Sequence, residues 1–142
     1  MNLNTAAYSA LLLRLSLGLT LLAHGAVLKL GTFGLAGTMG YFGSLGLPPI
    51  LGAIVAFGET AAGLALIAGV LVRTASLLAL PIVLGATFVH AGNGWVFNAP
   101  GGGWEYPALL AALLVVQAGL GAGAFALEPG RLLGRRAAAQ AA

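Results

Sequence analysis

The stretch "AIVAFGETAAGLAL", residues 53–66, decides the fold class of this chain. A single carboxylate, Glu59, lies inside an otherwise apolar run. A charged side chain at the middle of a bilayer costs about 2.5–3.5 kcal/mol on insertion scales, and it persists where it faces the interior of a helix bundle and finds a partner. The stretch therefore predicts a membrane helix whose Glu59 side faces other helices.

The composition of the whole chain agrees with a membrane protein. Of its 142 residues 60% are hydrophobic and 6% are charged, and the mean hydropathy is +1.03, whereas soluble domains carry about 25% charged residues. Cysteine is absent, so any redox chemistry needs electrons that reside on a bound molecule or on a partner. The net charge of +3 is too small to indicate a nucleic-acid partner.

Four apolar runs approach the roughly 20 residues that a helix needs to cross the hydrocarbon core. They are continuous and not alternating, which favours helices over a β-barrel. The sequence therefore predicts an all-α membrane protein, a four-transmembrane-helix bundle in one domain over residues 1–130, with a basic tail at 131–142. The expected spans are residues 6–28, 48–71, 75–90 and 106–127.

The positions of the basic residues predict the orientation. Arg73 lies between the second and third spans, and Arg131, Arg135 and Arg136 follow the fourth. Because cytoplasmic loops are enriched in Lys and Arg, both termini are expected in the cytoplasm and loops 29–47 and 91–105 outside. Lys29 is the exception. The first span is expected to be retained and not cleaved as a signal peptide, because Arg14 lies inside its apolar part.

Arg14 is the other charge expected inside the membrane, and an ion pair between Arg14 and Glu59 is the natural hypothesis. Both residues lie on stripes of small residues at helical spacing, which allow close helix contact. The stripes are Arg14, Gly18, Leu21 and Gly25 in the first span, and Gly52, Ala56, Glu59 and Gly63 in the second. The pair would either lock the two helices together or also bind a ligand or handle a proton.

The run "HAGNGWVFNAPGGGWEYP", residues 90–107, carries both tryptophans of the chain. Its glycines and prolines predict an irregular loop. Trp95, Trp104 and Glu105 would belong either to an interfacial belt or to a lid over the outer mouth of the bundle. The histidines, His24 and His90, approach the same side and would act as interfacial or capping groups, hydrogen-bond a quinone, or, with Glu105, bind a metal, although their spacing resembles no metal motif.

One polar group remains inside the fourth span. Gln117 is expected to hydrogen-bond across helices, as buried amides commonly do in membranes. The run "GLGAGAF", residues 119–125, suggests close helix contact there, within the chain or in a homo-oligomer.

These residues together resemble the DoxX family of small bacterial membrane proteins. The similarity includes "LLLRLSLGLTLLAHGAVLKL" at 11–30, "YFGSLGLP" at 41–48, "GET" at 58–60, and above all residues 90–107. The resemblance implies a four-helix bundle in the bacterial inner (plasma) membrane. Relatives include a subunit of a thiosulfate:quinone oxidoreductase and part of an oxidoreductase complex in oxidative-stress defence.

Two functions remain open at this stage. In the first, the chain is the membrane subunit of a quinone-linked oxidoreductase, without a covalent cofactor, and a redox-enzyme partner supplies electrons or substrate. In the second, it is a non-catalytic membrane anchor or assembly module for a partner protein. A transporter is less well supported, because four short spans carry few polar groups. The residues expected to bind a ligand are Arg14, His24, Glu59, His90, Trp95, Trp104, Glu105 and Gln117.

Overall fold

The computed structural model describes residues 3–127 and contains no strand in that range, which confirms the all-α prediction. The basic tail expected at residues 131–142 lies outside the described residues. The elements are α1 (Leu3–Leu22), the π-helix η1 (Ala23–Thr32), α2 (Gly34–Ser44), α3 (Ile50–Ala68), α4 (Val72–His90), the 3-10 helix η2 (Ala91–Asn93) and α5 (Glu105–Leu120).

Within residues 3–127, three helices are long and apolar enough to cross a membrane. They are the continuous helix Thr5–Thr32, formed by α1 and η1, then Ile50–Ala68, and Val72–Asn93, formed by α4 and η2. The helix α5 is apolar but has 16 residues, about 24 Å at 1.5 Å per residue. The span expected at 106–127 is too long, since the helix ends at Leu120. The glycines that follow, Gly121 and Gly123, adopt φ of 77° and 69°, which are not helical.

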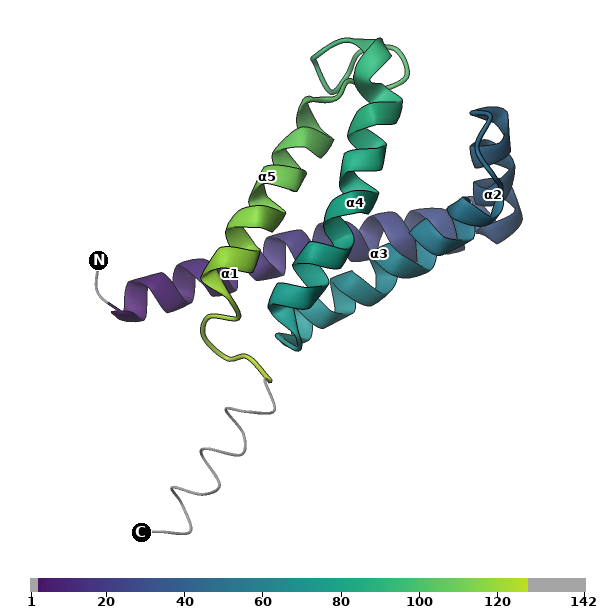
Figure 1. Ribbon diagram of the computed structural model, residues 1–142. Coiled ribbons are helices and arrows are strands. Elements are labelled where there is room, and N and C mark those ends of the chain that lie inside the picture. The colour runs from purple at the N-terminus through teal and green to yellow at the C-terminus, as the bar shows by residue number, and fades with distance from the viewer. Residues whose placement is uncertain (1–2, 128–142) are drawn as a thin grey trace, which may run out of the picture.

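The helices form two hairpins, as Figure 1 shows. In one, α3 lies against α1 and η1, and in the other α5 lies against α4. The hairpins share a core near the α3–α4 turn and then diverge, so that the far end of α4 and α5 stands apart from α2 (Figure 1). The buried core residues are Leu17, Leu21, Ala62, Leu66, Val72, Ala75, Ala79, Val83, Ala111, Leu114 and Ala122.

Close backbone contact joins α1 and η1 to α3. A Cβ added to Gly63 would lie 2.7 Å from the Leu22 nitrogen and 2.8 Å from the Gly18 oxygen. A Cβ added to Gly25 would lie 2.7 Å from the Thr60 nitrogen. All eight residues of the two predicted stripes are buried, which confirms the predicted packing faces.

The segment expected as an outer loop at 29–47 is mostly helical. The first helix continues as a π-helix to Thr32, where the Thr32 hydroxyl donates to the Val27 oxygen at 3.0 Å and the Phe33 N–H to the Leu28 oxygen at 2.8 Å. The helix α2 then packs on η1 and α3, and its Thr38 hydroxyl donates to the Lys29 oxygen at 2.8 Å. The sequence reasoning missed α2 because 11 residues are too few for a membrane span.

Candidate functional site

The partner of Glu59 is Lys29 and not Arg14. The Lys29 ammonium donates to Glu59 Oε2 at 2.7 Å, and the pair joins η1 to α3. The side chain of Lys29 is 20% exposed and that of Glu59 9%. The predicted Arg14–Glu59 pair is therefore wrong, although each charge lies on the face that was predicted for it.

The register of the antiparallel helices explains this error. Gly18 lies opposite Gly63, and Arg14 accordingly lies against Gly69 at the end of α3. Gly69 is ten residues beyond Glu59, about 15 Å along a helix axis. The spacing of residues along one helix does not give this offset between the two helices, and α1 extends beyond the end of α3 (Figure 1).

Arg14 holds the segment that follows α5. Its guanidinium Nη2 donates to the Ala124 oxygen at 3.1 Å, and the side chain is 1% exposed. The Ala124 N–H donates to the Ala7 oxygen at 2.9 Å, and the Leu127 N–H to the Ala68 oxygen at 3.3 Å. Residues 121–127 thus cross α1 and the end of α3, and they cover Arg14 from outside.

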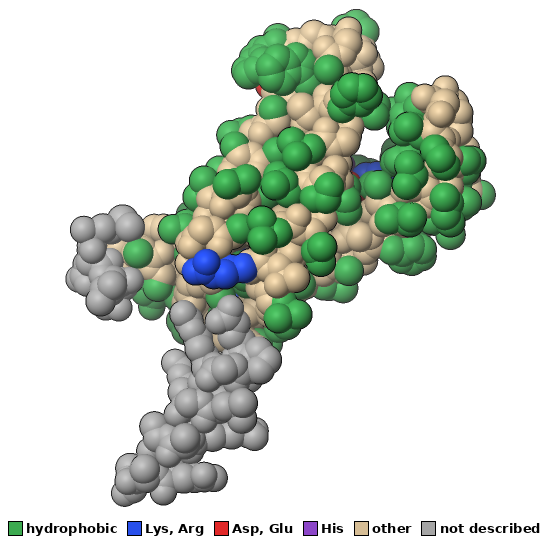
Figure 2. All heavy atoms as spheres, in the orientation of Figure 1, with side chains coloured by type: hydrophobic (Ala, Val, Ile, Leu, Met, Phe, Trp, Pro, Cys, Tyr) green, Lys and Arg blue, Asp and Glu red, His purple; other side chains and the backbone are tan. Residues whose placement is uncertain are grey.

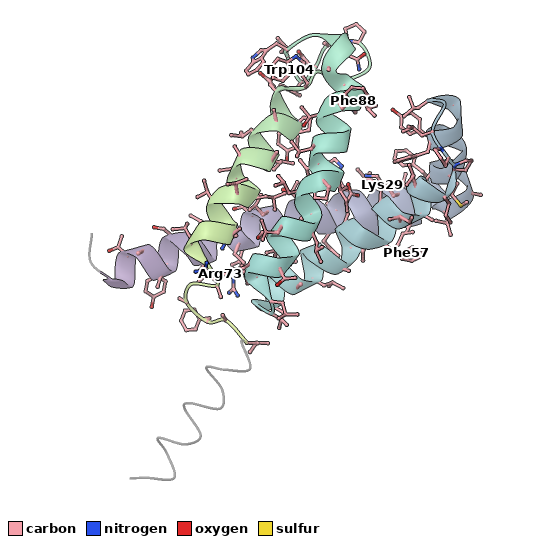
Figure 3. The ribbon with its side chains drawn as sticks, viewed as in Figure 1. Lys29, Phe57, Arg73, Phe88 and Trp104 are labelled. Atoms are coloured by element: carbon pink, nitrogen blue, oxygen red, sulfur yellow. The ribbon has the colours of Figure 1, made fainter. Side chains whose placement is uncertain are left out.

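The Lys29–Glu59 pair lies at the base of a hollow between the two hairpins. Figure 2 shows a hollow between α4 and α2 with a blue side chain at its base, and Figure 3, in the same orientation, labels this side chain Lys29. Phe88 of α4 projects at the rim and is 82% exposed. We call this hollow, with Lys29 and Glu59 at its base and Phe88 at its rim, the notch.

The two histidines lie on different hairpins. His24 is an exposed residue of η1, one π-helical turn before Lys29. His90 is the last residue of α4; its Nδ1 is 2.9 Å from the Ala86 oxygen, and its ring faces Gly102. Within residues 3–127 no group of three His, Cys, Asp or Glu side chains is placed to hold a metal ion.

Residues 94–104, between η2 and α5, form a loop that we call the aromatic loop, and its ends are held together by contacts within the loop and with its flanking residues. Trp95 and Trp104 form an edge-to-face pair with ring centres 4.5 Å apart. The Phe97 N–H donates to Glu105 Oε1 at 2.9 Å, and the Asn93 amide donates to the Gly101 and Gly102 oxygens, at 3.0 and 2.9 Å. The loop lies apart from α2 and leaves the notch open, so the structure does not show the expected lid over the bundle (Figure 1).

Gln117 does not hydrogen-bond across helices. Its Nε2 donates to the Gly121 oxygen at 2.7 Å, within the turn that ends α5. Its Oε1 is buried and has no hydrogen-bond partner among the described residues. The guanidinium of Arg73 lies over Gly121 on the outside of this turn, where Figure 3 labels it. A cation is favourable there because the C-terminal end of a helix carries partial negative charge.

The model of the DoxX family matches residues 9–92. The chain belongs to the DoxX family. Arg14, Lys29, Glu59 and His90 lie inside the matched region, whereas the tryptophans and α5 follow it. Comparisons with curated proteins and with solved structures gave no match.

The residues that were expected to hold a quinone in this DoxX protein form several separate groups. Glu59 lies in the notch, His90 and the tryptophans lie at the far end of α4 and α5, and Arg14 lies against Gly69. No single ring can touch all of them. The Lys29 ammonium is a hydrogen-bond donor that faces the notch.

Lys29 is the functional candidate that the sequence reasoning missed. It was treated as a loop charge that violated the orientation rule. Its position in the sequence indicated that it faces α3. It follows Gly25 by four residues and therefore lies near the same helix face. In the structure Lys29 is not a loop residue, since it lies within the apolar helix Thr5–Thr32 and pairs with Glu59.

Proposed function

We propose that this DoxX chain binds a quinone, or a similar small hydrophobic molecule with a hydrogen-bond acceptor, in the notch. In this proposal it is the membrane subunit of an oxidoreductase. The observation that supports it is the Lys29 ammonium, which is paired with Glu59 yet faces the open notch.

The donors of Lys29 favour a neutral acceptor. An ammonium group has three N–H donors, and within the described residues one of them is used, by Glu59. A hydrogen bond in surroundings of low dielectric constant is stronger than in water. Because the Lys29–Glu59 pair is already neutral, a carbonyl oxygen adds no buried net charge, whereas an anion would.

The redox role needs a second protein. The chain has no cysteine, so a partner enzyme would bring electrons or substrate, and a bound quinone would supply the two-electron carrier. The proposed location is the bacterial plasma membrane, as the family suggests, and Arg73 and the Arg-rich tail favour an orientation with both termini in the cytoplasm. The notch then opens toward the outer side, where His24 is the nearest titratable neighbour of Lys29 along the helix.

Extraction of co-purifying quinone tests this proposal. The protein is purified in mild detergent, and the quinone content per chain is measured for the parent, for Lys29→Met and for the double change Lys29→Met/Glu59→Leu. The expected result is a stoichiometric quinone in the parent and its loss in both variants. Arg73→Met is the matched control, since it removes an exposed cation away from the notch and should retain the quinone.

A second function is favoured by a different observation. The close contact of Gly18, Gly25 and Gly63 and the Lys29–Glu59 pair hold one hairpin together, as expected of a rigid membrane anchor for a partner protein. This function predicts no bound quinone and no binding of added ubiquinone or menaquinone. It also predicts that the double variant remains monodisperse. That combination of results would replace the quinone proposal.

A further inference from the structure

A groove lies where the aromatic loop meets the start of α5, and none of its lining residues belongs to the notch. It has a volume of about 470 Å³, within the range of small-molecule sites. We call it the aromatic groove. Its lining residues are Trp95, Phe97, Glu105, Tyr106, Ala108 and Leu109.

The lining combines aromatic rings with one carboxylate. Trp95, Phe97 and Tyr106 are 56%, 65% and 42% exposed, so their rings are available to a ligand. Aromatic faces attract organic cations, and cages of such rings recognise quaternary ammonium groups. Trp104 holds Trp95 in place through the edge-to-face contact.

Within the described part of the chain, no cation balances the charge of Glu105. Its Oε1 accepts the Phe97 N–H, but no Lys, Arg or His side chain among residues 5–127 lies within ion-pair distance. By contrast, Glu59 has Lys29. The aromatic groove therefore offers a negative charge beside three aromatic rings, a combination complementary to an ammonium ion.

The groove continues onto a face of α5 that is apolar. Ala108 and Leu109 follow Tyr106 along the first turns of α5, and Leu109 is 55% exposed. Trp and Tyr side chains lie preferentially at the level of lipid head groups. A ligand with its cation against Glu105 would thus extend its tail along α5 into the hydrocarbon region.

We propose that the aromatic groove binds the ammonium head group of a phospholipid, such as phosphatidylethanolamine, with an acyl chain against Ala108 and Leu109. This site is separate from the notch and does not depend on quinone binding. The lipid would occupy the leaflet at which α4 ends and α5 begins, and it would stabilise the loop that joins them.

Fluorescence quenching by brominated lipids tests the proposal directly. The two tryptophans of the chain both lie in residues 95–104, so their emission reports on this loop alone. The protein is reconstituted in phosphatidylglycerol vesicles that contain phosphatidylethanolamine brominated on its acyl chains. Brominated phosphatidylglycerol is the reference. We expect the ethanolamine lipid to bind at least about fivefold more strongly, which equals about 1 kcal/mol.

Two variants separate the contributions of charge and ring. Glu105→Gln removes the charge but keeps an oxygen that accepts the Phe97 N–H, and Tyr106→Leu removes one ring. Each should bring the preference close to equality. Tyr41→Leu is the matched control, because Tyr41 is an exposed tyrosine of α2, and it should leave the preference unchanged.

Other outcomes would overturn the proposal. Equal quenching by both lipids in the parent would do so, as would a preference that survives both Glu105→Gln and Tyr106→Leu. Equal quenching by the two brominated lipids, together with a change of tryptophan emission on adding millimolar free ethanolamine, would show that the site takes a soluble amine and not a lipid. Loss of helical circular dichroism in one variant leaves the other to decide, and loss in both would assign the residues to folding.

Discussion

Substitutions of Lys29 and Glu59 should have strongly non-additive effects on the free energy of unfolding. Its atoms are 2.7 Å apart, and the carboxylate side chain is 9% exposed. Removing one partner of a buried ion pair costs about 3–5 kcal/mol, whereas replacing both partners by apolar residues is often close to neutral. The two single variants and the double variant therefore test whether the pair exists as the structure shows it.

The exposed fractions of the two side chains predict that the two single variants lose unequal amounts of the free energy of unfolding. Lys29→Met leaves Glu59 buried without a cation, and we expect a loss of about 3 kcal/mol. Glu59→Leu leaves Lys29, which is 20% exposed and can turn into the notch, so we expect about 2 kcal/mol. The double variant should lie within about 1 kcal/mol of the parent, which gives a coupling free energy of at least about 4 kcal/mol.

The free energy of unfolding can be measured by titrating the protein with sodium dodecyl sulfate in mixed micelles, with helical circular dichroism as the signal. The control cycle pairs Arg14→Met with Glu59→Leu. These sites lie about 15 Å apart along the helix axis and should be additive within about 0.5 kcal/mol. Additive effects at Lys29 and Glu59, or strong coupling at Arg14 and Glu59, would refute the reasoning.

Three further predictions concern glycines. Gly63→Ala should cost about 1–3 kcal/mol in the same titration, because its Cβ would meet the backbone of Gly18 and Leu22. Gly85→Ala in α4 has no atom within 4 Å of its Cβ and should gain about 0.5–1 kcal/mol from helix propensity. Gly69→Ala should destabilise by at least about 1 kcal/mol, because φ is +71° and the Arg14 guanidinium occupies the space of the Cβ. Limited proteolysis after residue 120 should then be faster than in the parent, and an unchanged rate would contradict the role of Arg14 in holding that segment.

Helical periodicity was sufficient to identify the buried faces. The stripes through Gly18 and Gly63 were predicted from spacing, and every member is buried in the structure. Periodicity is a property of one helix, so it does not state which residue of a second helix lies opposite. The Arg14–Glu59 pair depended on that second kind of information, and it was wrong.

The composition of residues 90–107 predicted that the segment is irregular, but it did not predict the contacts within it. Gly and Pro in residues 90–107 predicted an irregular segment, and the segment after η2 is irregular up to Glu105. That Glu105 accepts the Phe97 N–H, and that Trp95 meets Trp104, follows from backbone turns at Gly94, Gly101 and Gly102 with positive φ. Those turns place the aromatic groove beside α5 and not over the notch.

Hydropathy and residue spacing by themselves determined that this chain is a helical membrane protein and which sides of the first two spans face inward, because these properties follow from the chemistry of single segments in lipid. Tertiary structure alone decided that Lys29, and not Arg14, neutralises Glu59. The reason is the offset between two antiparallel helices: backbone contact at Gly18, Gly25 and Gly63 sets the register, and the register brings one cation within hydrogen-bond distance while it carries the other to the end of α3.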